Sequence, residues 1–218
     1  MIAKLVTLSL YTTLVFVLST MAQAQGAPEF PDNKQQTNEG IAKRANEFGV
    51  WGSMSFDATT WIGYTPDARF GNVGLRYGRV LATSKTVAFE WTIDAIPVAI
   101  LSNSRVTFVP SFQSNRKSVY AWGISPIGLK LNFRRNKRVQ PFAASTGGFL
   151  YFNEQVPVSG AAHFNYTFDF QGGVQLVNSN QRSFMIGYKY NHISNGYHAP
   201  INPGVDVQMV FFGFSIFR

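Results

Sequence analysis

Apolar and polar side chains alternate along most of the chain after residue 47. In the stretch 161–177 one row of alternate side chains contains four consecutive aromatic residues, Phe164, Tyr166, Phe168 and Phe170. The intervening polar row consists of Asn165, Thr167, Asp169 and Gln171. Because successive side chains of a strand point to opposite faces, a period of two predicts a strand with one apolar and one polar face.

Eight stretches share this alternation or an aromatic-rich strand composition, and clusters of Gly, Pro, Asn or Ser separate them. They are 48–57, 69–81, 86–100, 118–133, 139–153, 161–177, 183–194 and 205–217. Pro126 interrupts the fourth stretch, and we expect a β-bulge there because proline cannot donate to a strand ladder. The pattern therefore predicts an all-β protein.

Alternation alone fits both a soluble β-sandwich and a membrane barrel, since the strands of each have one apolar and one polar face. Three features favour the barrel. The number of strands is even, their lengths reach the roughly 9–11 residues that a tilted membrane strand requires, and a secretory signal precedes them. We therefore expect an eight-stranded antiparallel up-and-down transmembrane β-barrel in the bacterial outer membrane.

The first 24 residues have the features of a secretory signal peptide. Lys4 precedes an apolar stretch at 5–18, and Ala22-Gln23-Ala24 matches a small-x-small cleavage site. An uncleaved membrane anchor is the alternative, but the apolar stretch is short and contains hydroxyl groups. The sequence thus predicts a signal peptide at 1–24.

The rest of the chain divides into two parts. Residues 25–47 are largely polar and without a clear period, which is typical of a flexible N-terminal segment. Residues 48–218 contain all eight predicted strands and are expected to form the barrel.

Composition narrows the function classes. The chain has no cysteine, which excludes disulfides, thiol chemistry and cysteine-based metal sites. Aromatic residues make up 15% and charged residues 14%, a balance that suits a protein whose bulky apolar groups face lipid. The net charge of +8 fits anionic membrane lipid as a partner, whereas nucleic acid is not expected for an exported protein.

The polar rows of the predicted strands face the barrel interior and carry both signs of charge. The inward acids are Glu90, Asp94 and Asp169, and the inward bases are Arg76, Lys130 and Lys189. An eight-stranded barrel is just wide enough for side chains to fill, so we expect these groups to pair with one another.

The predicted topology also fixes which connections share one end of the barrel. With both termini in the periplasm, the loops after the first, third, fifth and seventh strands lie outside the cell. These include the predicted loops at 101–117 and 195–205, whereas the basic turn at 134–138 lies inside.

Two polar side chains continue an apolar row toward the external end of the seventh strand. His192 and Ser194 are two residues apart and therefore project from the same face, the one that faces lipid. Asp206 shares the parity of the outward row of the eighth strand, which is the hairpin neighbour of the seventh. A general base, a nucleophile and an acid could therefore converge there, as serine hydrolysis requires.

An oxyanion formed during ester hydrolysis also requires hydrogen-bond donors. Asn195, Gly196 and Asn202 lie in the connecting loop and could supply amide side chains or backbone N–H groups. Spacing alone also fits ordinary polar residues at a membrane interface.

Two segments around these residues resemble the signature of a known family. The segments His192-x-Ser194-Asn195 and Asn202-Pro203-Gly204-x-Asp206 are similar to those of the lipid A 3-O-deacylases, the PagL-type outer-membrane hydrolases. The upstream segments that also resemble the family are 122–128, 140–142 and 147–152. Together the resemblance spans roughly 48–217.

The resemblance implies a barrel that hydrolyses the ester-linked acyl chain at position 3 of lipid A without a metal or other cofactor. Ser194 would be the nucleophile, His192 the base and Asp206 the orienting acid. Asn202 and Asn195 would be the oxyanion donors. One departure concerns the acid, because the family typically has glutamate where this chain has aspartate, one methylene shorter.

The sequence therefore predicts an outer-membrane serine esterase, a monomer or homodimer, with lipid A of lipopolysaccharide as substrate entering laterally from the membrane. Two alternatives stay open. The barrel could be structural and non-catalytic, or it could be an esterase or phospholipase that acts on glycerophospholipids.

Overall fold

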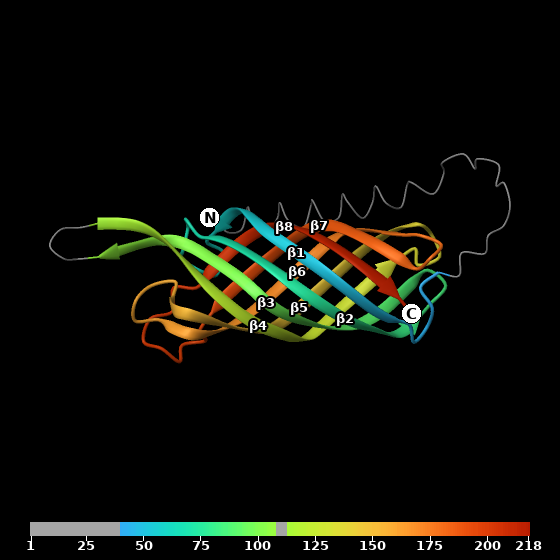
Figure 1. Cartoon of the computed structure of the whole chain (residues 1–218), viewed down its shortest axis with the longest axis horizontal. Coiled ribbons are helices and arrows are strands. Elements are labelled where there is room, and N and C mark those ends of the chain that lie inside the picture. Colours follow the sequence, from blue (N-terminus) through green and yellow to red (C-terminus); the bar gives the residue numbers. More distant parts are fainter. Residues whose placement is uncertain (1–39, 108–112) are drawn as a thin grey trace, which may run out of the picture. The chain divides into compact units, whose positions relative to one another are not determined.

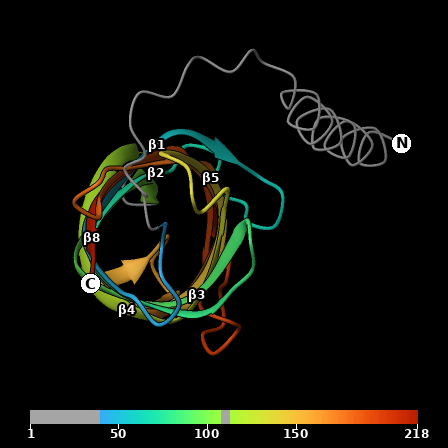
Figure 2. The same cartoon turned by 90° about the vertical axis from the view of Figure 1, so that its right-hand side faces the viewer.

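Eight antiparallel strands form a barrel that closes through pairing between the first and the last strand (Figure 1). The computed structural model describes residues 40–107 and 113–218. The strands are β1 (Asn46–Thr59), β2 (Arg69–Thr83), β3 (Val87–Thr107), β4 (Gln113–Phe133), β5 (Val139–Val156), β6 (Ala162–Val177), β7 (Arg182–Ser194) and β8 (Val205–Phe217). Each strand pairs with its neighbour in sequence, and the view along the barrel shows the closed ring (Figure 2). The predicted fold is confirmed.

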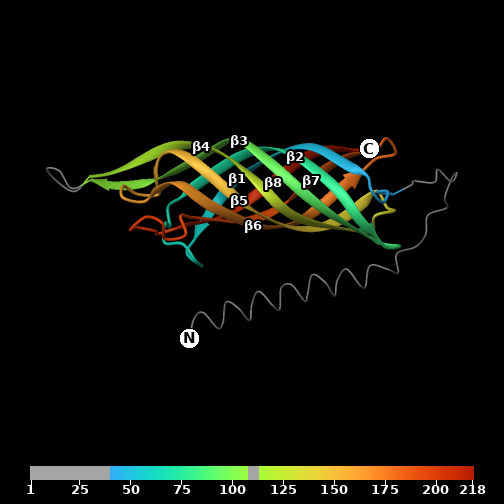
Figure 3. The ribbon, with the colours of Figure 1, turned by 90° about the horizontal axis from the view of Figure 1, so that it is seen from below.

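The predicted strands agree with the observed ones except at some ends. The largest difference concerns the loop predicted at 101–117, where β3 and β4 continue to pair from Leu101 and Val119 up to Thr107 and Gln113. Figures 1 and 3 show this hairpin extending past the other strands. The loop prediction was wrong because the sequence there lacks an apolar row, whereas backbone pairing outside a membrane does not require one.

The start of the barrel also differs from the prediction. The predicted signal peptide at 1–24, and the segment 25–47 up to residue 39, lie outside the described residues. Of the residues that were expected to be flexible, 40–45 pack against one end of the barrel, where Ile41 is fully buried, and 46–47 begin β1. The Arg44 backbone N–H donates to the Val80 carbonyl at 3.1 Å. Ile41 and Ala45 pack against Val80, Ala88 and Phe217, and the Arg135 side chain donates to the Ile41 carbonyl. These contacts join residues that are distant in sequence, so they produce no periodic signal.

The exterior of the barrel is apolar. Large side chains that are between 43% and 53% exposed there include Phe48, Val50, Leu75, Phe184, Ile186, Phe212 and Phe214. Exposed apolar rows of this extent are stable only against lipid, and closure of the sheet leaves no unpaired edge there. In the described part of the chain, no helix is both long and apolar enough to cross a membrane.

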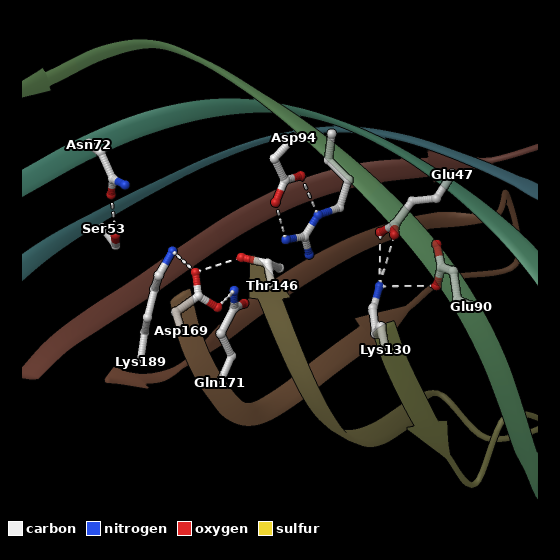
Figure 4. A network of polar contacts seen from close by, with 11 residues as sticks. Glu47, Ser53, Asn72, Glu90, Asp94, Lys130, Thr146, Asp169, Gln171 and Lys189 are labelled. Atoms are coloured by element: carbon white, nitrogen blue, oxygen red, sulfur yellow. Dashed lines mark hydrogen bonds and ion pairs between the residues drawn. The ribbon is translucent and has the colours of Figure 1, made fainter. Parts of the chain in front are cut away.

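Within the described residues, the interior contains three buried ionic groups, which Figure 4 shows. Arg76 makes two hydrogen bonds of 2.8 Å to Asp94. Lys189 lies 3.0 Å from Asp169.

In the third group Lys130 lies 2.9 Å from Glu47 and 3.5 Å from Glu90. All three predicted bases are therefore paired with acids, as expected. Glu47 was not foreseen as a partner because it precedes the first predicted strand.

The interior is not polar throughout. The inward row of β8 is apolar, and Val207, Met209 and Phe211 are fully buried. The Phe211 ring lies 5.8 Å from Trp51 and 6.3 Å from Phe142, measured between ring centroids. This apolar packing and the ion pairs together fill the barrel, so that it forms a rigid support for the groups on its outer face.

Proline produces the predicted irregularity in β4. The pairing with β5 shifts between Ile124 and Ile127, and the pairing with β3 shifts between Thr92 and Asp94. Both shifts place one extra residue in β4 next to Pro126, which is the definition of a β-bulge.

The Arg76–Asp94 pair provides a test of the interior. Arg76→Met leaves a buried carboxylate without its partner, and we expect the free energy of unfolding to fall by about 3–5 kcal/mol. Replacing both partners, Arg76→Met with Asp94→Leu, should restore most of the loss because no charge is left buried. The measurement is urea-induced unfolding in lipid vesicles.

Lys117→Met serves as the control, since the Lys117–Glu154 pair is exposed and should contribute less than about 1 kcal/mol. If Arg76→Met alone were as stable as this control, the Arg76–Asp94 pair would not be a buried ion pair that the barrel depends on.

Candidate active site

The predicted base and acid lie directly opposite each other on neighbouring strands. His192 on β7 and Asp206 on β8 are register partners, and His192 Nδ1 lies 2.5 Å from Asp206 Oδ1. Both residues continue rows that face outward: Phe184 has the parity of His192 on β7, Phe212 has the parity of Asp206 on β8, and both rings are exposed. The shorter acid therefore reaches the imidazole, since the strand register places the two Cα atoms side by side.

Three donors hold the Asp206 carboxylate. His192 Nδ1–H donates to Oδ1, while the backbone N–H groups of Ile62 and Gly63 donate to Oδ2 at 2.6 and 2.9 Å. Asp206 is fully buried, and these bonds favour its ionised form. Donation through Nδ1 fixes the imidazole tautomer, so Nε2 carries the lone pair that can accept a proton.

The loop between β1 and β2 (60–68) covers this pair. Tyr64 donates its backbone N–H to the Pro203 carbonyl at 2.7 Å, and Thr65 Oγ1 donates to the Gly204 carbonyl at 2.6 Å. Two glycines allow the loops to approach: a Cβ atom on Gly63 would lie 2.7 Å from the Gly204 carbonyl carbon, and Gly204 has φ +66°. Sequence reasoning missed this loop, because backbone donors give no residue signal.

Aromatic rings lie beside the imidazole on the outer face. The Phe168 ring lies 5.0 Å from the His192 ring, and Trp61 stacks on Tyr190 with centroids 5.0 Å apart. His192 is consequently only 6% exposed, although its row faces outward. The rings and the covering loop reduce the access of water to the His192–Asp206 pair.

Ser194 lies at the end of β7, beyond the last residue pair of β7 and β8. It shares the face of His192, about 7 Å farther along the strand, and is partly exposed. Among the described residues the Ser194 hydroxyl makes no hydrogen bond with His192. The structure therefore places the predicted nucleophile beside the imidazole but does not join the two.

Asn195 is fully engaged within its own loop. Its backbone N–H donates to Asn202 Oδ1 at 3.0 Å, and its Nδ2 donates to the Ile201 carbonyl at 2.8 Å. Its Oδ1 accepts the Tyr197 N–H at 2.9 Å. Asn195 therefore shapes the loop and, in this structure, has no donor directed at a ligand.

The other two predicted donors are available. Within the described residues, neither the Asn202 side-chain nitrogen nor the Gly196 N–H takes part in a hydrogen bond. Gly196 has φ +62°, a conformation that glycine adopts without strain. Both residues belong to the β7–β8 loop beside Ser194.

Within 40–107 and 113–218, no three His, Cys, Asp or Glu side chains gather as a metal ion would require.

Comparison with known proteins relates the chain to a hydrolase family. A family model described as lipid A 3-O-deacylase (PagL) matches residues 72–215, a range that includes His192, Ser194 and Asp206. No curated protein matches the sequence.

Among solved structures, the crystal structure of the outer membrane enzyme PagL matches with a TM-score of 0.56 and 13% identity, over 76% of this chain and 97% of that one. OprG from Pseudomonas aeruginosa matches with a TM-score of 0.47 and 11% identity, over 84% and 99% of the two chains. Neisserial surface protein A matches with a TM-score of 0.45 and 11% identity, over 79% and 97%. The fold is that of a bacterial outer-membrane β-barrel, as the sequence predicts.

Gly63→Ala tests whether the covering loop holds Asp206. The added Cβ would meet the Gly204 and Val205 backbone at less than 3 Å, so the loop must shift and withdraw its N–H groups. We expect the His192 Nδ1–H proton resonance, measured by NMR, to move because the shared carboxylate changes its donors.

Gly147→Ala is the matched control, since nothing lies within 4 Å of its added Cβ. An unchanged resonance in Gly63→Ala would mean that the loop does not hold the carboxylate.

Proposed function

The chain belongs to the lipid A 3-O-deacylase (PagL) family, and we propose that it hydrolyses the ester at position 3 of lipid A in the outer membrane. One observation carries the proposal: an imidazole is hydrogen-bonded to a buried carboxylate on the lipid-facing side of the barrel, two residues from a serine. A site for an ester that is anchored in a membrane would need this location.

Ser194, His192 and Asp206 would act as nucleophile, base and orienting acid. Ser194 Oγ attacks the ester carbonyl while His192 Nε2 takes its proton. The tetrahedral intermediate then collapses, and the sugar hydroxyl leaves with the proton from the imidazolium. Water hydrolyses the acyl-serine in a second cycle of the same proton transfers, which releases the fatty acid and restores the serine.

Asp206 supports this role through its position and its donors. The carboxylate stabilises the imidazolium that forms in each step, and its 2.5 Å contact with Nδ1 holds the ring in the required tautomer. The contact supports the assignment of aspartate, one methylene shorter than glutamate, to this role. Ser194 and His192 would then approach as the substrate fills the space beside them, since catalytic hydrogen bonds often tighten only in the complex.

Asn202 Nδ2 and the Gly196 N–H are the oxyanion donors in this proposal. Both lie in the loop that follows Ser194, and neither is used by another group of the described chain. Asn195 has a positioning role, because its N–H holds the Asn202 side chain through Oδ1. Donors fixed before the reaction stabilise the oxyanion without further reorganisation.

The substrate would approach laterally from the membrane. The lumen is filled by side chains, whereas the outer surface near the site presents exposed apolar groups. Trp61, Ile62, Tyr64 and Tyr197 are 50%, 55%, 78% and 81% exposed. Tryptophan and tyrosine are favoured where a barrel meets the lipid headgroups. The ester of the substrate would lie at this level of the membrane.

Substitution of the proposed nucleophile and base tests the activity. Ser194→Ala and His192→Ala should abolish deacylation, and mass spectrometry of lipid A should then show retention of the 3-linked chain. Asp206→Asn should lower kcat on the order of 10⁴-fold by removing the charge that supports the imidazolium. Folding is checked by the heat-modifiable electrophoretic mobility of the barrel. Release of the chain at the normal rate by Ser194→Ala cells would refute the assignment.

Asn202→Asp tests the oxyanion donor separately from the loop. Aspartate keeps the oxygen that accepts the Asn195 N–H but lacks the donating nitrogen. We expect kcat to fall on the order of 10²–10³-fold or more, with little change in KM. Full activity of this variant would assign the donor to another group.

A non-catalytic barrel is the second candidate, and the missing Ser194–His192 hydrogen bond favours it. A serine-reactive ester probe discriminates between the two. Labelling at Ser194 supports the enzyme, whereas inserted protein that takes up no label supports the structural role. Supplying purified protein with both lipid A and glycerophospholipids also separates a lipid A deacylase from a phospholipase.

A further inference from the structure

A carboxylate faces the lipid side of β1 close to the proposed site. Regular alternation places the odd-numbered residues of β1 inside the barrel, and Trp51 and Ser53 are only 4% and 7% exposed. A β-bulge interrupts the pairing with β8 between Ser55 and Asp57. As a result Phe56 and Asp57 are both exposed. The bulge therefore puts outside the barrel a charge that the pattern would put inside.

Among residues 40–107 and 113–218, the side-chain partners of Asp57 are weak. Gln208 Nε2 lies 3.5 Å from Asp57 Oδ2, and Tyr188 Oη lies 3.5 Å from Gln208 Oε1. Both distances are at the long limit for hydrogen bonds. The side chains of Asp57, Gln208 and Tyr188 therefore keep most of their hydrogen-bonding capacity unused. No ion pair to Asp57 is present in the described chain. Charged groups on the lipid face are costly, and a ligand that donates hydrogen bonds would offset this cost.

These groups adjoin the His192–Asp206 pair. On β8, Asp206 pairs in register with His192 of β7 and with Thr59 of β1. Gln208 pairs in the same way with Tyr190 of β7 and with Asp57 of β1. Asp57 and Gln208 thus lie one outward position farther along the strands than Asp206, about 7 Å from it. Tyr188, the register partner of Val210, lies one outward position beyond them. A molecule larger than a single ester that reacts at Ser194 would extend over them.

We propose that Asp57, Gln208 and Tyr188 form a subsite for the amino-sugar backbone of the substrate, a conclusion that rests on the proposed function. A carboxylate and a side-chain amide accept and donate hydrogen bonds to sugar hydroxyls and to amide N–H groups. The methylene chain of an acyl group offers no such donor, and a phosphate would be repelled by Asp57. The sugar is therefore the part of a glycolipid that this chemistry fits.

The surface beyond the subsite is apolar and accepts the rest of such a molecule. A hollow of about 370 Å³ lies on the same outer face and includes Gly52, Met54 and Phe212 in its lining. Met54 precedes the bulge by one residue, so the hollow adjoins the polar groups. A ligand with a polar backbone and several acyl chains matches this succession of polar and apolar surfaces.

Binding without turnover tests the subsite. The Ser194→Ala variant is titrated with lipid A and, separately, with phosphatidylglycerol, which lacks the sugar, and binding is followed by tryptophan fluorescence, to which Trp61 contributes. In the Ser194→Ala background, the further substitution Asp57→Ala should raise the ratio of the Kd for lipid A to the Kd for phosphatidylglycerol about tenfold. This change corresponds to the loss of one hydrogen bond to a charged group. Gln208→Ala should shift the ratio in the same direction.

Glu154→Ala is the control, because it removes one acid at the same end of the barrel, where Glu154 pairs with Lys117. If the Kd ratio of the Asp57 variant equals that of this control, the proposed subsite is wrong. It is also wrong if the Ser194→Ala protein does not bind lipid A. In the active protein, the ratio of kcat/KM for lipid A to kcat/KM for p-nitrophenyl decanoate should fall by the same factor. Hydrolysis that persists in Ser194→Ala refutes the proposed function instead, whatever the effect of Asp57.

Discussion

Pairing of β1 with β8 is the constraint on which the rest of the molecule depends. A sheet in lipid must satisfy every backbone N–H and C=O group, and only a closed barrel achieves this with strands. Closure fixes the strand register, and the register in turn places His192 opposite Asp206. The same closure determines which side chains face lipid, so that the candidate site lies on the outer surface of the barrel and not in its lumen.

The filled interior makes this external site possible. Lys189, Arg76 and Lys130 are buried together with their acidic partners, and breaking any of these pairs leaves an uncompensated charge. Strands that cannot shift without breaking such pairs hold the residues on their other face in fixed positions. The interior thus contributes to the site through rigidity, whereas the chemistry depends on the outward rows.

Strand periodicity explains which features the sequence could predict. The period of two identified all eight strands and placed His192, Ser194 and Asp206 on one face, because each follows from parity. Periodicity failed at Asp57, where a bulge reverses the parity, and at Leu101, where the strand continues without an apolar row. It carried no information on the 60–68 loop, whose position depends on contacts between loops that are distant in sequence.

The donors that the 60–68 loop supplies to Asp206 belong to the main chain. Any residue except proline carries the same N–H group, so position 62 can vary during evolution while the carboxylate keeps its environment. Conservation of side chains would therefore understate the importance of this loop. Related barrels can preserve such an arrangement through loop shape alone, which is visible to structural comparison but not to alignment of residue types.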